Sequence, residues 1–329
     1  MEPSSNLLDK TENENENENK NVLIIKRKLG QGKFSVYYAD CPSKKTGYAL
    51  KIFPRNLQGI LQFNKEKFIT KLNHPNIIQY IPIQFKSKDF YSLATEFAPY
   101  GDLFEWMTYD ALNDILVRTY FHQFIEGLEY IHSKGIAHLD LKLENLMIGE
   151  EFKLKIIDFD QSQLLKDRWI TSGGTLIYRA PEVVKKVCKN LTAVDIYSAG
   201  VTLYCLITKE YPFVENDLLK NKEVSSYQTF VQNNENFWKG KVESCKKKGY
   251  LNQDFIDLIN GMLELKPEKR LKIEGIKGSK WYQGPVLDQE SLKTEMQTKW
   301  EIISKKNKDV EKQQIEQSVK KTWGKGTFE

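Results

Sequence analysis

The sequence predicts an α+β fold in two lobes, and three observations support this prediction. Short β-prone runs rich in Val, Ile, Tyr and Phe fill residues 22–97. After Tyr100-Gly101, apolar residues recur mostly at helical spacing. A short segment near 98–101 separates the two patterns. We therefore expect a β-rich N-lobe over 22–97, a hinge, and a helix-rich C-lobe over 102–282.

The expected elements follow in order along the chain. The β-prone runs are VLIIKRKLG, SVYYAD and YALKIF, separated by glycine and by the turn PSKKTG, with two more over 77–85 and 90–97. A helix is expected over 60–72, closed by Asn-His-Pro. In the C-lobe, two apolar sets have helical spacing: Tyr120, Phe124, Leu128 and Ile131, and Phe255, Leu258, Ile259 and Met262.

The two ends of the chain have a different composition. Residues 1–21 include TENENENENK, which has almost nothing apolar to bury and is expected to be disordered. Residues 283–329 form a charged, partly helical tail with sparse apolar points at Trp300, Ile303, Val310, Val319 and Trp323. We expect this tail to pack back on the domain. A helix that binds a regulatory partner is the alternative.

Composition narrows the functional class. The chain has 329 residues, 40% hydrophobic and 28% charged, and a net charge of +5 in which Lys and Glu interleave, which argues against nucleic-acid binding. Its four cysteines have no CxxC spacing, which argues against zinc and a disulfide framework. The most apolar stretch, Ala193–Ile207, is interrupted by Asp195 and is short, so a buried core helix is expected rather than membrane insertion. The N-terminus is acidic and polar, unlike a signal peptide, so we expect a cytoplasmic protein, with the nucleus as the alternative.

Two features of the N-lobe could bind phosphate. The stretch Leu29–Ser35, LGQGKFS, lies between two β-prone runs, and its glycines allow backbone N–H groups to close over phosphates. A tight hairpin uses glycine in the same way, so this signal is weak alone. Lys51 ends the run YALK beyond that loop, where it could direct a positive charge at a phosphate chain.

A second cluster of chemical groups lies in the stretch AHLDLKLEN, 137–145. Asp140 could orient or deprotonate an attacking hydroxyl, and Lys142 could neutralise a phosphoryl group in transfer. Asn145 offers an oxygen ligand of the kind that magnesium prefers, and Asp158, thirteen residues later, is a second candidate ligand. The stretch GTLIYRAPE, 174–182, then follows, with Asp195 and Arg270 further along.

In this order and at these separations, the motifs resemble the eukaryotic protein kinase family over about 22–282. Lys142, two residues after Asp140, is similar to the serine/threonine branch. GDLFEWM at 101–107 and the closing KPEKRLKIEGIKGSKWY are most similar to calcium/calmodulin-dependent-type kinases, although the chain has no EF-hand loop.

The resemblance implies a two-lobed kinase fold with ATP between the lobes and Mg²⁺ as the metal. Asp140 would be the catalytic base, and Asn145 and Asp158 would hold the metal. Lys51 would bind the α- and β-phosphates, Asp195 would brace the catalytic loop, and Glu182 would pair with Arg270. The implied catalytic set is Asp140, Lys142, Lys51, Asn145 and Thr175. The implied nucleotide contacts are Gly30, Gln31, Gly32, Lys33, Val36, Ala49, Lys51, Glu66, Glu96, Ala98, Asp102, Met147 and Asp158, with Thr95 at the back of the pocket.

The sequence departs from the family pattern at several positions. Leu139 replaces the Arg that normally grips an activation-loop phosphate, and Thr171 is where that phosphorylation site would fall. The helix Glu expected ten residues before the Pro of His-Pro-Asn is Lys65, with Glu66 beside it.

For that helix, we expect Leu61, Lys65, Phe68, Ile69 and Leu72 to share one apolar face. A helix turned by one residue, about 100°, would bring Glu66 to Lys51 instead, and we favour Glu66 as the partner. Similarly, the Val expected over adenine falls on Tyr37, with Val36 one position early.

Asp160 stands where the family has glycine. Glycine allows positive φ, and among other residues Asp and Asn tolerate left-handed geometry best, at about 1–2 kcal/mol. We expect metal binding to persist at Asp158, while Asp160 stiffens the turn, slows or alters its switching and adds a negative charge near the metal.

The leading hypothesis is a protein serine/threonine kinase that acts on ATP and protein substrates, because every residue expected to touch the phosphoryl group or its metal is present. The alternative is a pseudokinase that binds nucleotide as a scaffold, suggested by Tyr37, Lys65, Leu139 and Asp160 together. A small-molecule kinase is disfavoured, because segment 174–182 resembles one that docks a polypeptide.

Overall fold

The computed structural model describes residues 23–31, 33–83, 88–167, 174–186, 188–213, 226–245 and 249–305. The chain divides into two compact units. The first runs to Thr70 and resumes at Gln79–Phe97, and the second comprises Lys71–Ile78 and the chain from Ala98. The strip 71–78, which the sequence pattern places among the β-rich residues, therefore packs with the helical unit. The segment expected to be disordered, 1–21, lies outside the described residues.

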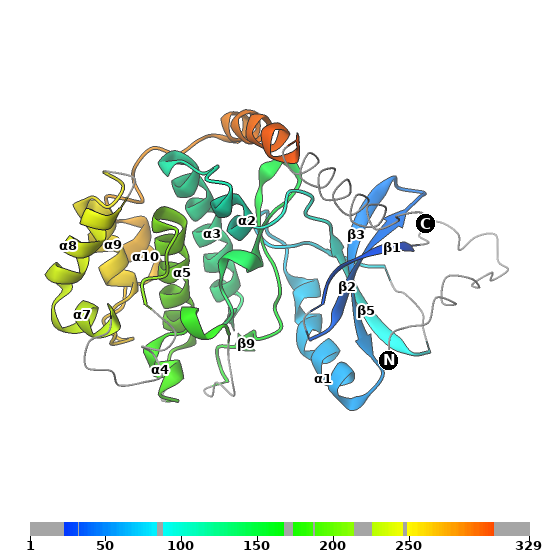
Figure 1. The fold of residues 1–329 in the computed structure, drawn as a ribbon. Helices are drawn as coiled ribbons and strands as arrows, with labels where there is room; N and C mark the ends of the chain where they lie inside the picture. The colour runs from blue at the N-terminus through cyan, green and yellow to red at the C-terminus, as the bar shows by residue number, and fades with distance from the viewer. Residues whose placement is uncertain are drawn as a thin grey trace, which may run out of the picture. The chain divides into compact units, whose positions relative to one another are not determined.

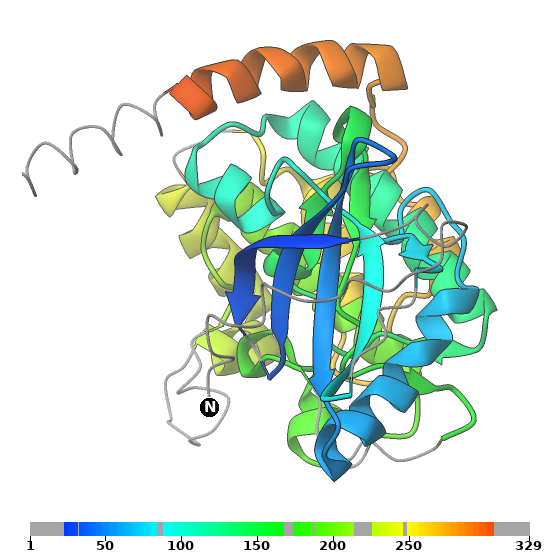
Figure 2. The ribbon, with the colours of Figure 1, turned by 90° about the vertical axis from the view of Figure 1, so that its right-hand side faces the viewer.

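The first unit is built on an antiparallel sheet of five strands in the order β1-β2-β3-β5-β4 (Figures 1 and 2). The strands are β1 (Ile24–Gln31), β2 (Ser35–Cys41), β3 (Thr46–Pro54), β4 (Tyr80–Ile81) and β5 (Phe90–Glu96). β4 is much shorter than the expected run 77–85. Pro82, which has no N–H for a ladder, directly follows it, and Ile77 pairs instead with Ile156 in the second unit.

The two faces of this sheet pack against different groups of side chains. One face carries the core cluster, which comprises Leu23, Ala39, Cys41, Tyr48, Leu50, Ile83 and Ala94. On the other face, Phe53 packs against Phe34 and against Phe63 of α1 (Leu57–Glu66). Alternate residues of a strand point to opposite faces, so Lys51 lies on the α1 face and Leu50 on the core face.

The helix expected over 60–72 is two elements. α1 covers Leu57–Glu66, with Asn56 as its N-cap, and a 3₁₀ helix follows over Lys67–Lys71. The predicted apolar face is confirmed at Ile69 and Leu72, which are buried, and is wrong within α1, where Leu61 is 61% exposed and Gln62 and Glu66 are buried instead. The prediction assumed α-helical spacing across a segment whose second half has a different number of residues per turn.

The second unit is mainly helical. Its longer helices are α3 (Asp114–Ser133), α5 (Leu191–Thr208), α8 (Asn234–Ser244) and α9 (Gln253–Met262). Shorter helices are α2 (Leu103–Thr108), α4 (Pro181–Val184), α7 (Ser226–Gln232) and α10 (Ile273–Lys277). Two small antiparallel ladders pair β6 (Ile136–Ala137) with β9 (Gln163–Leu164), and β7 (Leu146–Ile148) with β8 (Leu154–Ile156). The 3₁₀ turn Leu143–Asn145 directly precedes β7.

The predicted helical faces in this unit are confirmed. Both apolar sets, on α3 and on α9, are buried. α5 is longer than the stretch read from the sequence, and by length and hydropathy its 18 residues could cross a membrane, so shortness does not argue against a membrane span. However, 89% of the helix is buried inside the protein, which identifies it as the expected core helix.

The described part of the tail is a helix over 289–305, drawn in orange in Figures 1 and 2. It buries Leu292, Met296 and Ile303 along one face. Trp300 contacts the rings of Tyr100 and Trp106, with ring centroids 5.3 and 6.0 Å apart. This part of the tail therefore packs on the second unit, whereas Val310, Val319 and Trp323 lie outside the described residues.

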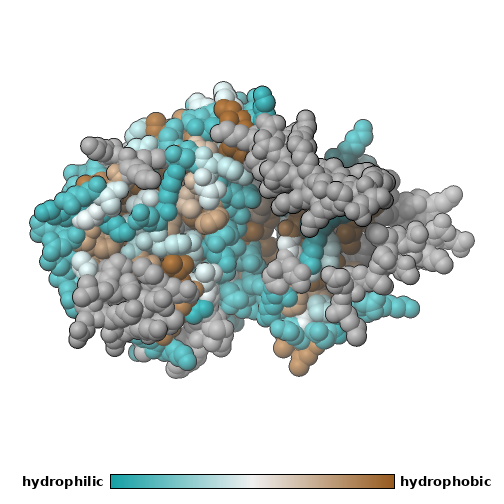
Figure 3. All heavy atoms as spheres, viewed as in Figure 1, coloured by the Kyte–Doolittle hydropathy of each residue, from teal (hydrophilic) through white to brown (hydrophobic). Residues whose placement is uncertain are grey.

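On the face shown in Figure 3, brown hydrophobic spheres are scattered among hydrophilic ones over the helical unit.

Candidate active site

Lys51 in β3 forms an ion pair with Glu66 at the end of α1. Lys51 Nζ lies 2.9 Å from Glu66 Oε2, and the two side chains are 18% and 6% exposed. Both groups belong to the first unit. The partner of Lys51 is thus Glu66, the residue favoured over Lys65.

The 3₁₀ helix after α1 accounts for this choice. A 3₁₀ helix turns by about 120° per residue and an α-helix by about 100°. Over the five residues Lys67–Lys71, the excess is therefore about 100°, which is the rotation of one α-helical residue. The tighter segment compensates for the one-residue offset between Glu66 and the His-Pro-Asn motif.

The sheet register also resolves the offset at Val36. Val36 pairs with Lys51, and Tyr37 pairs with Leu50, so Val36 lies on the Lys51 face of the sheet and Tyr37 on the core face. Ala49 and Thr95 face each other on β3 and β5, on the same side as Lys51. An irregularity in the β1–β2 pairing between Lys28 and Gly30 adjusts the strands near the glycine-rich loop. The pairing of β2 with β3 therefore places Val36 on the face where the family pattern expects a Val, although Val36 comes one position early in the sequence.

The loop before Asp140 is anchored by a buried carboxylate. Asp195 in α5 is fully buried, and its Oδ1 accepts the N–H of Leu139 at 2.8 Å. Its Oδ2 lies 2.8 Å from the N–H of His138 and from Nε2 of His132. These contacts are the ones expected of a residue that braces this loop. These contacts satisfy buried backbone N–H groups, which would cost free energy if they were left without an acceptor.

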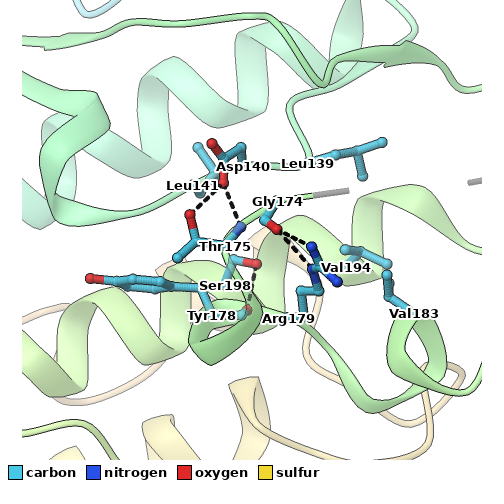
Figure 4. Close-up of a pocket in the computed structure, with 10 residues that line it drawn as sticks. All are labelled: Leu139, Asp140, Leu141, Gly174, Thr175, Tyr178, Arg179, Val183, Val194 and Ser198. Atoms are coloured by element: carbon cyan, nitrogen blue, oxygen red, sulfur yellow. Dashed lines mark hydrogen bonds between the residues drawn. The ribbon is translucent and has the colours of Figure 1, made fainter. Parts of the chain in front are cut away.

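Asp140 contacts three other predicted catalytic residues, of which Figure 4 draws Thr175. Its Oδ1 accepts hydrogen bonds from the N–H and Oγ1 of Thr175, at 2.8 and 3.1 Å. Lys142 Nζ lies 3.0 Å from Thr175 Oγ1 and 3.3 Å from Asp140 Oδ2. The Asn145 amide donates to the backbone oxygen of Asp140 at 2.8 Å. The structure thus brings these four residues together within the second unit.

Gly174 lets segment 174–175 approach the loop 138–145, which we call the catalytic loop. Its φ is +69°, and a Cβ at this position would lie 2.5 Å from the backbone oxygen of Leu139 and 3.2 Å from Asp140 Oδ1. Glycine is therefore required both for the backbone conformation and for space. Arg179 donates from Nε and Nη2 to the Gly174 oxygen, which holds this approach in place (Figure 4).

Leu139 is buried and has a φ of +64°. For a non-glycine residue this conformation costs about 1–2 kcal/mol. The hydrogen bond from its N–H to the buried carboxylate of Asp195 offsets part of that cost. Leu139, Val183 and Val194 are among the residues that line a small pocket (Figure 4), so this position is apolar where the family pattern has a charged Arg.

The donor set of Asn145 and Asp158 fits a hard divalent cation. Because the Asn145 Nδ2 atom donates to Asp140, its Oδ1 atom is the one that can bind a metal ion. Asp158 follows β8 with a φ of +59°, and Phe159 beside it is buried against His138, with ring centroids 4.9 Å apart.

The positive φ of this turn is therefore at Asp158. Asp160 is not among the residues with positive φ in the described chain, so the residue that replaces glycine needs no tolerance of left-handed geometry here, and its expected effect on the turn stays a prediction.

The remaining predicted nucleotide contacts lie at the end of β5, in the segment before α2 and in β7. The N–H of Glu96 donates to the backbone oxygen of Gln79, and Ala98 is buried. Asp102 is the N-cap of α2, where its Oδ1 accepts the Glu105 N–H at 2.9 Å, and burial raises its pKa. Met147 pairs with Asp102 in an isolated bridge.

Glu182 and Arg270 form a buried pair with two hydrogen bonds, at 2.6 and 3.0 Å. Arg270 also donates to the backbone oxygens of Ala193 and Glu264, so the pair ties α4 to α5 and to the segment after α9.

Of the other predicted residues, Gly30 and Gln31 lie in β1 and Lys33 follows it, whereas Gly32 and Thr171 lie outside the described residues. Sequence reasoning missed three supporting side chains: Gln62 beside Glu66, His138 beneath the catalytic loop and Arg179. A polar residue four positions before Glu66 was the available signal for Gln62. His138 and Arg179 stand inside quoted motifs but had no assigned role.

Comparison with known proteins supports the same assignment. The family model described as "Protein kinase domain" matches residues 23–282. CBL-interacting protein kinase 28 of Oryza sativa subsp. japonica is 32% identical over 275 residues, which cover 80% of this chain and 59% of that protein. CBL-interacting protein kinase 26 of the same organism is 33% identical, covering 78% of this chain and 51% of its own. Serine/threonine-protein kinase SIK2 of Gallus gallus is 32% identical, covering 83% and 34%.

The chain spans about half the length of the first relatives it matches. The family model covers most of this chain, and the two lobes with their motifs agree with it. The chain therefore belongs to the protein kinase family.

Proposed function

We propose that this chain is a protein serine/threonine kinase that transfers the γ-phosphoryl group of ATP, with Mg²⁺, to hydroxyl groups of protein substrates. The carrying observation is the cluster of Asp140, Lys142, Thr175 and Asn145, held by one another and by Asp195. The family uses ATP and Mg²⁺ in general, and relatives named as serine/threonine kinases support the same activity.

Each residue of the cluster has a role in this proposal. Asp140 Oδ2, whose contacts with Lys142 and Asn145 are 3.3 and 3.4 Å, is the oxygen that would accept the hydroxyl proton. Lys142, whose Nζ is fixed by Thr175, would neutralise charge on the phosphoryl group in transfer. Asn145 Oδ1 and Asp158 would hold Mg²⁺, which would shield the phosphate charge when bound.

The first unit supplies the proposed nucleotide contacts. Lys51, oriented by Glu66, would bind the α- and β-phosphates, and Val36 and Ala49 on the same sheet face would contact adenine. A Cβ at Gly30 would meet no atom within 4 Å, so packing does not explain this glycine, whereas close approach of a phosphate does.

The test is phosphate transfer from radiolabelled ATP to the chain itself and to a basic generic protein, followed by phosphoamino-acid analysis. We expect phosphoserine or phosphothreonine, and a loss of about 10²–10⁴-fold in Asp140→Asn. Asp257→Asn, on an exposed turn of α9, is the matched control. Equal and negligible incorporation by wild type and Asp140→Asn, with binding of MgATP retained, would instead identify a scaffold that binds nucleotide.

We further propose that the tail, 283–329, is where a regulatory partner acts. The support is the docked helix 289–305 and the word "CBL-interacting" in the names of several relatives. A chain ending at Gly284 tests this proposal. Altered transfer activity of the folded shorter chain supports it, and unchanged kcat and KM contradict it.

We propose the cytoplasm as the place of action. Cys41, Cys188 and Cys205 are buried thiols, which suits a reducing compartment. Imaging of a fluorescent fusion in cells tests this location.

A further inference from the structure

A chain of side-chain hydrogen bonds connects the glycine-rich loop to the ion pair of the first unit. Lys33, just after β1, donates from Nζ to Gln62 Oε1 at 3.4 Å. Gln62 in α1 donates from Nε2 to Glu66 Oε1 at 3.0 Å. Glu66 Oε2 then accepts from Lys51 Nζ at 2.9 Å. All four residues lie in the first unit, so the chain of contacts needs no particular placement of the second.

The chemistry of the partners fixes the orientation of the Gln62 amide. A carboxylate only accepts and an ammonium only donates. The amide atom that faces Glu66 must therefore be Nε2, and the atom that faces Lys33 must be Oε1. Gln62 is the one side-chain type in this chain of contacts that can serve both neighbours, because it carries a donor and an acceptor.

The hydrogen bond between Gln62 and Glu66 is buried and lies at a favourable helix spacing. Gln62 and Glu66 are 7% and 5% exposed, so water competes little for their hydrogen bonds. They are four residues apart on α1, the spacing at which helix side chains meet. Glu66 is also the last residue of α1, where the chain passes into the 3₁₀ helix. No α-helical turn follows Glu66 directly to pack against its side chain. The hydrogen bond from the Gln62 amide, one turn earlier in α1, holds the carboxylate instead.

We propose that Gln62 is a positioning residue. It orients the Glu66 carboxylate toward Lys51 and connects that ion pair to Lys33 of the glycine-rich loop, so that the loop and Lys51 act on the phosphates together. Gln62 acts through Glu66 and Lys33 and touches neither the nucleotide nor the substrate. This inference rests on the proposed kinase function, because the phosphates are those of ATP.

Gln62→Met is the informative variant, because Met keeps the length and helix propensity of Gln but lacks the donor and the acceptor. We expect kcat/KM for ATP to fall roughly tenfold, mainly through KM, while KM for the protein substrate is unchanged. The matched control is Gln58→Met, the same change on an exposed position of the same helix. It should behave as wild type.

A double-mutant cycle separates positioning from a general structural effect. If Gln62 acts through Glu66, Gln62→Met should cause no further loss in a Glu66→Gln background. Losses that multiply would overturn the inference, as would a Gln62→Met enzyme with wild-type kinetics. If Gln62→Met does not fold, judged by its melting temperature, Lys33→Met replaces it. Because Lys33 is itself a predicted nucleotide contact, Lys33→Met is combined with Glu66→Gln: losses in KM for ATP that do not multiply support the connection to the loop, and losses that multiply overturn it.

The affinity for MgATP distinguishes this inference from the proposed function. A wild type that binds MgATP without transferring phosphate refutes the kinase activity, yet weaker binding by Gln62→Met than by Gln58→Met would still support the positioning role. A wild type that neither transfers phosphate nor binds MgATP would overturn both.

Discussion

The predicted site residues of the two units are held in different ways. In the second unit, the catalytic loop is fixed through its backbone: the N–H groups of His138 and Leu139 both donate to the buried carboxylate of Asp195. In the first unit, the contacts described for Lys51 are with side chains: Glu66 pairs with Lys51, and the Gln62 amide donates to Glu66.

This difference explains where the sequence could change. Asp195 accepts the backbone N–H of Leu139, so this contact does not depend on which side chain stands at 139. Leu can therefore occupy this position, which has a positive φ. Contacts made by side chains depend on which residue stands at each position and on the direction in which the helix points it. The one-residue offset at Lys65 and Glu66 therefore needs the 3₁₀ helix after α1 to compensate for it.

Removing the backbone anchor should have the largest effect. In Asp195→Asn, one side-chain oxygen becomes an NH₂ group that cannot accept, so one of the two buried backbone N–H donors, of His138 or of Leu139, loses its partner. We expect a loss of about 2–4 kcal/mol in the free energy of unfolding, together with most of the transfer activity. Denaturant unfolding and kcat measure the two effects.

The exposed change Asp257→Asn serves as the control for Asp195→Asn. If Asp195→Asn keeps full stability and kcat, the loop is held by something other than this carboxylate.

Breaking the side-chain anchor should affect activity without comparable loss of stability. Glu66→Gln keeps the size of the side chain but removes the charge that pairs with Lys51. We expect a fall of about 10²-fold in kcat/KM for ATP and a small change in melting temperature. The neighbouring Lys65→Gln should have a much smaller kinetic effect. Similar losses in both variants would argue against the phase given to α1 by the structure.

These two regions also show what the sequence could and could not predict. Strong periodicity placed the buried faces of α3 and α9, because packing against one core enforces one spacing over many residues. The face of α1 was misjudged, because the change to a 3₁₀ helix at Lys67 leaves no mark in an apolar pattern.

The chemistry-bearing motifs predicted which residues meet around Asp140, but not the conformation of the backbone between them. The positive φ lies at Asp158 rather than Asp160. Similarly, which face of the sheet carries Val36 depends on strand pairing, which is a long-range property.

A third variant tests whether the tail belongs to the backbone-anchored unit. Trp300→Ala removes the ring that contacts Tyr100 and Trp106. Trp300 is only half-buried, so we expect a loss of about 1–2 kcal/mol in stability, less than for a fully buried Trp. The Lys51–Glu66 pair lies in the other unit, so binding of MgATP should change little.

Lys299→Ala, the half-buried neighbour on the same helix, is the control for Trp300→Ala. If Trp300→Ala leaves stability unchanged, the tail helix contributes nothing to the second unit.

The smallest expected effect is a pH dependence confined to the second unit, which holds all four histidines of the chain. Burial lowers the pKa of His74 and of His122 below the ordinary value of 6.5. Between 6.5 and each lowered pKa, the unfolded chain therefore binds more protons than the folded one, and stability falls as the pH falls through that window. Above 6.5 both imidazoles are neutral in both states, so stability should be flat.

His122→Gln should reduce this acid sensitivity. Nε2 of His122 lies 2.7 Å from the backbone oxygen of Tyr282, which only accepts, so this nitrogen carries the proton. A Gln amide can donate in its place without titrating. The contrast appears in urea unfolding of both proteins at pH 7.5 and pH 5.5. The variant should lose less stability than wild type, by less than about 1 kcal/mol, because Glu126 nearby partly opposes the effect of burial. Equal losses in both proteins would show that carboxylates, which both units contain, set the acid response, and pH would then not distinguish the two units.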